Sequence, residues 1–165
     1  MHRHQAPEVR EVRFAGADRA TATPDVVDAI EAAELIVIAP SNPIVSVGPI
    51  LAVGGIREAL DGVRRRGVPI VAVSGIVGGR ALKGPADRML ASLGHAPSAL
   101  GVARLYAGLA DGFVLDEVDA GLRSSVEALR LVTLVTDTIM TDDAARARLA
   151  AEVVAFGRSL QPVPS

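Results

Sequence analysis

The sequence contains no cysteine and no tryptophan, and only 2% of its residues are aromatic. Without cysteine there is no disulfide framework, thiol nucleophile or thiolate metal site, so nothing indicates an oxidising compartment and we expect a cytoplasmic protein. The shortage of aromatic side chains argues against a stacking platform for single-stranded nucleic acid. The hydrophobic core must therefore be built from aliphatic side chains.

An excess of charge and a long apolar run are also missing. The 17 basic and 19 acidic residues give a formal net charge of −2, which provides no broad cationic surface for duplex nucleic acid or an anionic membrane. No apolar run reaches the roughly eighteen residues that a membrane span needs. The first ten residues lack the apolar segment of a signal peptide. We therefore expect neither nucleic acid nor a membrane as a partner.

What the sequence does contain is typical of one folded domain. Half of the 165 residues are hydrophobic and 22% are charged, whereas disordered chains lack enough apolar surface to offset the entropy lost on ordering. A chain of this length buries one core. Residues 1–165 are therefore predicted to form a single domain.

Short β-branched runs alternate with helical patterns along the chain. The expected strands are 12–14, 35–38, 69–73, 112–115 and 131–135, and the expected helices are 24–33, 55–66, 85–93, 99–110, 118–129 and 142–158. The middle three strands are apolar almost throughout, as in strands that are covered on both faces. This alternation predicts an α/β fold, a doubly wound and mostly parallel Rossmann-like sheet with helices on both faces.

Ligands of open parallel sheets bind outside the carboxyl ends of the strands, so the loops that follow the strands are the places to search. The first such loop places Ser41 and Asn42 between Pro40 and Pro43. Its hydroxyl, amide and backbone N–H groups could hold a phosphate. The alternative interpretation is a turn that only reverses the chain.

The second loop, residues 74–85, combines glycine with positive charge. Gly78 and Gly79 let backbone amides approach an anion, and Lys83 is the single lysine among 17 basic residues. An ammonium group is a compact charge that suits a phosphate in a tight pocket. The spacing does not match a Walker A loop, and a flexible surface loop is the alternative.

The third loop follows the last expected strand and contains Asp137. A carboxylate at the end of a strand could hold a metal or a sugar hydroxyl. More often such a residue caps a turn or faces solvent. The three histidines, His2, His4 and His95, have no metal-ligand spacing with acidic residues, and we expect them on the surface.

Five blocks of sequence, taken in order, resemble the CofD/FbiA family of 2-phospholactate or phosphoenolpyruvate transferases of deazaflavin coenzyme biosynthesis. The resemblance runs from about Pro7 to Phe156. Five ordered blocks are far more specific than any one of them. The blocks are Ala39–Val53, Val77–Asp87, Ser98–Arg104, Asp111–Asp116 and Val135–Thr138.

The resemblance implies a reaction in coenzyme F-420 biosynthesis. Such enzymes move a 2-phospholactyl or phosphoenolpyruvyl group from a guanosine diphosphate conjugate to the hydroxyl of Fo, releasing GMP with Mg²⁺ present. On this basis Ser41 and Asn42 would hold a phosphate, the Gly78–Gly79 backbone would approach the nucleotide and Lys83 would offset negative charge. Asp137 completes the set of candidate binding residues. Neither a catalytic residue nor a metal ligand is assigned, and the choice between lactate and enolpyruvate stays open.

Members of that family are about twice as long as this chain, which resembles their C-terminal half and lacks the glycine-rich N-terminal half. We therefore expect activity to need an oligomer or a partner chain that supplies the other half. The alternative is a non-catalytic, truncated α/β module for nucleotide binding or assembly. An apolar face left exposed by the truncation would favour association.

Overall fold

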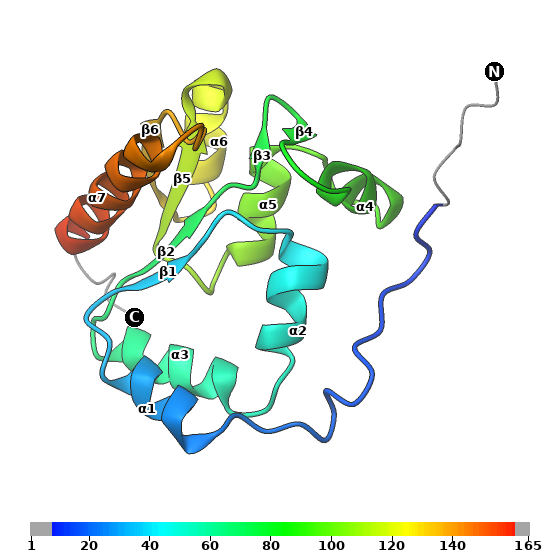
Figure 1. Cartoon of the computed structure of the whole chain (residues 1–165), viewed down its shortest axis with the longest axis vertical. Coiled ribbons are helices and arrows are strands. Elements are labelled where there is room, and N and C mark those ends of the chain that lie inside the picture. Colours follow the sequence, from blue (N-terminus) through cyan, green and yellow to red (C-terminus); the bar gives the residue numbers. More distant parts are fainter. Residues whose placement is uncertain (1–7, 161–165) are drawn as a thin grey trace.

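The computed structural model describes residues 8–160 and confirms the predicted α/β fold (Figure 1). A parallel sheet has the strand order β1-β2-β5-β6, so neighbouring strands follow the order of the chain. The two central strands are buried at every residue. Four of the expected strands are thus confirmed. They are β1 (Ile36–Ile38), β2 (Ile70–Val73), β5 (Gly112–Asp116) and β6 (Val132–Thr136).

Helices lie before, between and after these strands, in the segments where the periodicity predicted them. They are α1 (Pro24–Glu31), α3 (Ile56–Arg65), α4 (Ala86–Ser92), α5 (Ala99–Tyr106), the 3₁₀ segment η2 (Glu117–Leu122) continuing into α6 (Arg123–Glu127), and α7 (Asp143–Ser159). No helix in residues 8–160 is both long and apolar enough to cross a membrane. His2 and His4 lie outside the described residues, and His95 is exposed, as expected.

Two predictions in the first third of the chain are wrong. Residues 12–14 form no strand, because they run outside the sheet and the Phe14 ring packs against Gly48 instead. The segment after β1 was expected to be a loop. It is partly helical, with a π-helical turn η1 (Pro43–Val47) followed by α2 (Gly48–Leu51). Its prolines occupy first-turn positions, where a missing N–H costs nothing.

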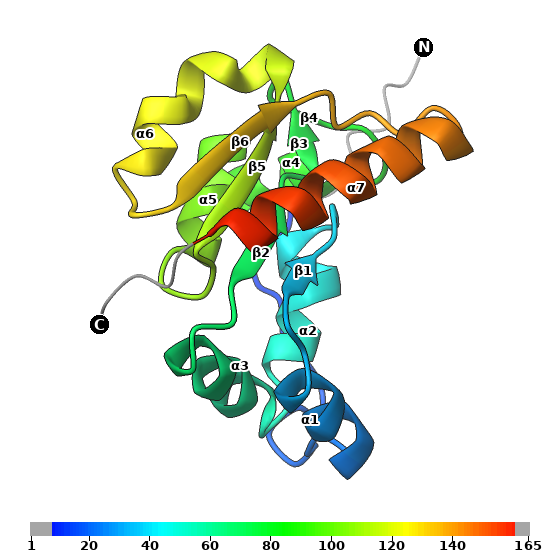
Figure 2. The same ribbon diagram turned by 90° about the vertical axis from the view of Figure 1, so that its left-hand side faces the viewer.

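The two faces of the sheet are covered differently. One face packs against the helices that connect the strands, because right-handed crossovers to strands added in one direction all lie on the same side. The other face is covered by α7 alone among residues 8–160, and Figure 2 shows this helix lying across the sheet. The first core includes Ile70, Ala72, Phe113 and Leu115 with Leu60, Leu90, Val102 and Val126; the second joins Val71, Val73 and Val114 to Leu149 and Val153.

Strand β1 departs from the expectation that it is covered on both faces. It lies at one edge of the sheet. Its central residue, Val37, is 41% exposed, whereas its register partner Val71 is fully buried beneath α7. The apolar β1 strand therefore packs against the core on one face and leaves Val37 exposed on the other.

Candidate functional site

The loops that follow the four parallel strands form a connected row along the carboxyl edge of the sheet. Contacts join the β1 loop to the β2 loop, the β2 loop to η2 after β5, and the β5 end to the β6 loop. All three loops that the sequence singled out belong to this row. The edge is thus the place where a ligand of this fold is expected.

The β1 and β2 loops approach each other at Ser41 and Gly75. A Cβ atom on Gly75 would lie 2.9 Å from the carbonyl oxygen of Ser41 and 3.3 Å from its nitrogen. Only glycine permits this approach without a shift of backbone. The exposed Ser41 is therefore fixed beside the end of β2.

Asn42 is mainly the cap of the helical turn that follows it. Its Oδ1 accepts hydrogen bonds from the backbone N–H groups of Ile44 (2.9 Å) and Val45 (3.2 Å), as an N-cap side chain does. Its Nδ2 makes a 3.5 Å contact with the sulfur of Met89 on α4. The amide N–H groups, and not the oxygen, are the part of Asn42 that can meet an anion.

The β2 loop contains a small hairpin, with β3 (Ile76–Val77) paired to β4 (Arg80–Ala81). Gly78 and Gly79 form its turn with φ angles of +56° and +78°, a conformation that favours glycine. The N–H of Gly78 donates to Oδ2 of the buried Asp119 at 3.0 Å. This bond ties the hairpin to η2 and occupies one of the two glycine amides predicted to face a nucleotide.

Lys83 lies in the loop between β4 and α4 and is exposed. No hydrogen bond or ion pair engages its ammonium group within residues 8–160, and the same holds for the exposed guanidinium of Arg80. These two cations are close in sequence to the hairpin turn. Their charge is available to an anion that binds at this edge.

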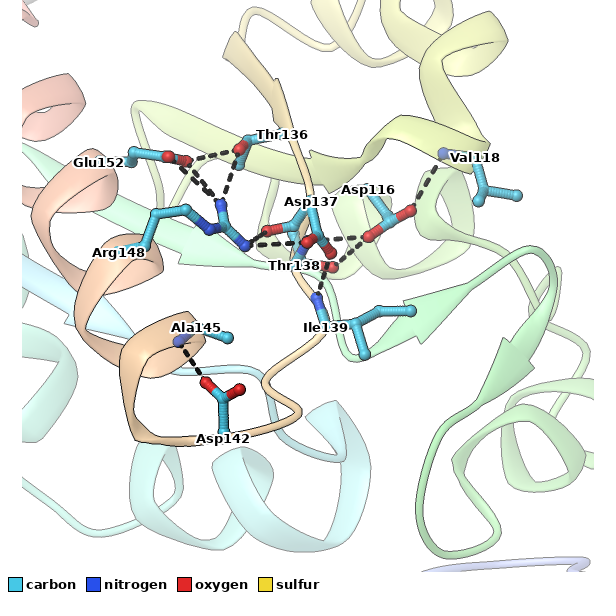
Figure 3. Close-up of polar contacts among 10 residues, drawn as sticks. All are labelled: Asp116, Val118, Thr136, Asp137, Thr138, Ile139, Asp142, Ala145, Arg148 and Glu152. Carbon is cyan, nitrogen blue, oxygen red and sulfur yellow. Dashed lines mark hydrogen bonds and ion pairs between the residues drawn. The ribbon is translucent and has the colours of Figure 1, made fainter.

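The β5 and β6 ends are joined through the buried carboxylate of Asp116 (Figure 3). One oxygen accepts from the N–H of Val118 at 3.0 Å, and the other accepts from the N–H (2.8 Å) and hydroxyl (2.9 Å) of Thr138. Burial alone would raise the pKa of Asp116, but these hydrogen bonds lower it below its ordinary value. Asp116 is thus held as a carboxylate that positions both loops.

Asp137 is paired within its own loop. Its carboxylate accepts from the N–H of Ile139 (3.0 Å) and from Arg148 of α7 (3.1 Å), whose guanidinium also bonds the Asp137 carbonyl at 2.7 Å (Figure 3). Nearby, the Thr136 hydroxyl donates to Glu152 and lowers the pKa of its carboxyl, and Arg148 lowers it further.

The structure brings the candidate residues to one edge of the sheet but not to one point. Ser41 and Asn42 follow β1, whereas Asp137 follows β6 at the opposite side of the four strands. Two strands intervene, so the β1 and β6 ends are about 14 Å apart at the usual strand spacing. The β1 and β2 loops form the closer group, and Asp137 is separate from it.

Similarity to known proteins covers nearly the whole chain. The family model described as 2-phospho-L-lactate transferase CofD matches residues 1–154. The chain belongs to the CofD family. This assignment confirms the resemblance that the five ordered blocks indicated.

Curated relatives within the CofD family carry two names. A phosphoenolpyruvate transferase of Streptomyces griseus is 43% identical over 147 residues, which is 88% of this chain and 45% of the relative. A 2-phospho-L-lactate transferase of Methanothermobacter thermautotrophicus is 39% identical over 140 residues, 85% of this chain and 43% of the relative. The chain thus spans less than half the length of these relatives and matches their C-terminal part.

Three polar residues at this edge of the CofD-family chain were not predicted as site residues. All three are buried: Asp116 and Asp119 join neighbouring loops through hydrogen bonds, whereas the Ser74 hydroxyl bonds the backbone of Ile76 within its own loop. Ser74 and Asp116 stand at the ends of apolar runs, the same signal that singled out Asp137. Asp119 lies inside a predicted helix, and nothing in its local sequence points to the distant Gly78.

The acidic residues of this edge do not by themselves fit a Mg²⁺ ion. No cluster of three metal-binding side chains occurs within the part of the chain that the structure describes. Asp116 accepts three hydrogen bonds, Asp119 is bonded to Gly78 and Asp137 is paired with Arg148. The three carboxylates are therefore already engaged by groups of the protein.

Proposed function

We propose that this chain provides the C-terminal half of a cytoplasmic transferase in coenzyme F-420 biosynthesis. Its donor would be a guanosine diphosphate conjugate of phospholactate or phosphoenolpyruvate, and its acceptor the hydroxyl of Fo. The family match over residues 1–154 carries this proposal. The geometry supports it at one place, where the Ser41 loop meets Gly75 at the carboxyl edge of the sheet.

The proposed step breaks the phosphoanhydride bond of the donor and forms a phosphodiester with the acceptor. The oxygen of the acceptor hydroxyl attacks the phosphorus atom that carries the lactyl or enolpyruvyl group, and the bond from this phosphorus to the bridging oxygen of GMP breaks. The hydroxyl proton passes to solvent, and GMP leaves. Such a transfer depends on positioning and charge neutralisation and needs no covalent nucleophile.

The residues of this chain would contribute to donor binding. The Ser41 hydroxyl and the Asn42 amide N–H groups are hydrogen-bond donors next to the β2 end, and the Gly79 backbone lies in the hairpin turn. Lys83 would neutralise a diphosphate charge. Asp137 stays a predicted binding residue, with Arg148 as its partner in the structure. Mg²⁺ enters this proposal only with the donor diphosphate.

Calorimetric titration with GDP and Mg²⁺ tests this assignment, with ATP as the control for unselective phosphate binding. We expect selective GDP binding that weakens about 10- to 150-fold in Lys83→Ala, the value of a charge-assisted contact of roughly 1.5–3 kcal/mol. Arg57→Ala is the matched control, because it removes another exposed cation from α3. Equal GDP affinity in the two variants would mean that Lys83 is a solvated surface residue that does not contact GDP.

A second candidate function is binding without transfer. Its support is the exposed charge of Lys83 and Arg80 beside the strand-end loops, which suits an anion and requires no catalytic residue. A turnover assay with the N-terminal part of the Streptomyces griseus relative separates the two. Release of GMP in the presence of Fo and the donor supports the transferase, whereas GDP binding without turnover supports a nucleotide-binding module.

A further inference from the structure

The hairpin formed by β3 and β4 is too small to fix its own position. Two pairs of residues join its strands, Ile76 with Ala81 and Val77 with Arg80, and the hairpin lies apart from the four parallel strands (Figure 1). A two-stranded hairpin alone is marginally stable in water. Its base is anchored, because Ile76 is fully buried and the Ser74 hydroxyl bonds the Ile76 backbone. The position of its turn must come from contacts with other elements.

One directed contact holds this turn from outside. The N–H of Gly78 donates to Oδ2 of Asp119 at 3.0 Å, and within residues 8–160 no other side chain forms a hydrogen bond with Gly78 or Gly79. A Cβ on Gly78 would lie 3.4 Å from the Val118 side chain, and a Cβ on Gly79 would lie 3.5 Å from the carbonyl oxygen of Pro97. Glycine gives the backbone extra freedom at this point. The bond to Asp119 is therefore what fixes the turn.

Asp119 itself stands on a firm support. It is 8% exposed and belongs to η2, which is capped by Asp116 through the 3.0 Å bond from the N–H of Val118. Asp116 is bonded in turn to Thr138 after β6. A carboxylate also makes a stronger hydrogen bond with a backbone N–H than a neutral acceptor does. The turn of the hairpin is thereby held at a fixed place relative to the carboxyl ends of β5 and β6.

Two exposed cations belong to the segment that this turn controls. Arg80 directly follows the turn, and Lys83 lies two residues after the end of β4. The attraction between opposite charges falls with their separation. A hairpin that is free to swing would therefore spread both charges over many positions, whereas a fixed hairpin presents them at one.

The charge of Asp119 separates two roles that the residue could have. Gly78 and Gly79 are consecutive, so an anion at the Gly79 amide would lie close to the Asp119 carboxylate, and like charges repel. By electrostatics alone, removal of the carboxylate would strengthen the binding of an anion. If Asp119 serves to hold the hairpin, its removal weakens that binding. The two roles thus predict opposite signs.

We propose that Asp119 is the positioning residue of the β3–β4 hairpin and holds Arg80 and Lys83 where they meet a phosphate group. Asp119 touches no ligand in this arrangement and acts through the hairpin. The proposal rests on the proposed function, which supplies the donor diphosphate as the anion. It makes the affinity for the donor depend on a side chain of η2.

Calorimetric titration of the full chain with GDP and Mg²⁺ measures this sign. We expect Asp119→Ala to weaken GDP binding about tenfold, through the loss of one hydrogen bond to a charged group. Asp119→Asn should keep the affinity, because its amide oxygen can still accept the Gly78 N–H. The losses in Asp119→Ala and Lys83→Ala should add to less than their sum in the double variant, since Asp119 acts partly through Lys83. Glu117→Ala is the matched control, because it removes an exposed carboxylate from the same η2 segment and should not weaken binding.

Trypsin gives a second readout that needs no ligand. Cleavage of the bond between Arg80 and Ala81 requires β4 to leave its pairing with β3. Mass spectrometry should show this cut about tenfold faster in Asp119→Ala than in the natural chain, by the same lost hydrogen bond. Asp119→Asn and Glu117→Ala should be cut at the rate of the natural chain. Circular dichroism confirms that the variants fold.

Three results overturn the proposal. They are GDP binding by Asp119→Ala that equals or exceeds that of the natural chain, fully additive losses in the double variant, and an unchanged rate of cleavage after Arg80. Failure of the proposed function is distinct. A natural chain that does not bind GDP rejects that function, and the trypsin rates then decide alone whether Asp119 holds the hairpin.

Discussion

The carboxylate of Asp116 and the backbone and hydroxyl of Thr138 hold the last two parallel strands together at their carboxyl ends. One oxygen of Asp116 accepts both donors of Thr138, at 2.8 and 2.9 Å. Both residues are buried. The loops after β5 and β6 are therefore fixed by a charge that does not face solvent.

Replacing Asp116 by asparagine should destabilise the protein. The amide can accept on one side only, so a buried donor of Val118 or Thr138 loses its partner, at a cost of roughly 1–3 kcal/mol in the free energy of unfolding. Asp137→Asn is the control, because it removes an exposed contact with Arg148 that contributes about 1 kcal/mol or less. Urea unfolding measures both, and equal losses in the two variants would contradict the assignment.

Acid should destabilise the protein through the same carboxylate. The unfolded chain has an Asp pKa of about 3.9, whereas hydrogen bonds hold the pKa of folded Asp116 lower. The unfolded state thus binds more protons, and the free energy of unfolding falls as the pH drops below about 5 and through the folded pKa. Glu152, whose pKa is also lowered, adds to this loss. Urea titrations between pH 7 and pH 3 should show a smaller loss for Asp116→Asn than for the natural chain.

The single tyrosine should make the protein lose stability at alkaline pH. Tyr106 is 2% exposed, and burial raises its pKa to about 12. Because the folded pKa exceeds the unfolded value, stability is complete below about pH 10 and is lost as the pH rises toward 12. Phenolate absorbance should therefore appear only near pH 12 or with unfolding. Ionisation near pH 10 in a chain that keeps its far-ultraviolet circular dichroism would contradict this packing.

Gly75→Ala should separate the loops after β1 and β2. The added Cβ meets backbone atoms of Ser41 at 2.9 and 3.3 Å, so relief requires a backbone shift that costs about 1–3 kcal/mol. Gly121→Ala is the matched control, since a Cβ there has no neighbour within 4 Å. Thermal unfolding compares the two variants. A Gly75→Ala protein as stable as the control would mean that the loops do not touch in solution.

The parallel core was predictable because its signal is local. The runs at β2 and β5 are apolar at nearly every position, and such runs are typical of strands covered on both faces. Sequence analysis failed where the decision lies in distant contacts. Residues 12–14 have the β-branched pattern of a strand, but Phe14 packs against Gly48 instead of pairing.

The candidate site was predictable in position but not in detail. Strand ends identified the loops of Ser41, Gly78 and Asp137, and the structure places all three at one edge. The sequence could not reveal that Asp119 bonds the Gly78 amide across 41 positions of chain. Nor could it separate Asp137 from Ser41, because strand order decides which loops become neighbours.

The sequential strand order leaves one face of the sheet to be covered by the last helix, α7. The pairings β1–β2, β2–β5 and β5–β6 join strands that leave the ribosome one after another, so each pairing can form while later residues are still being added. Helix α7 is the last described element to emerge, and it alone covers Val71 and Val114 within residues 8–160. Docking of α7 is therefore the step that removes this apolar face of the sheet from water.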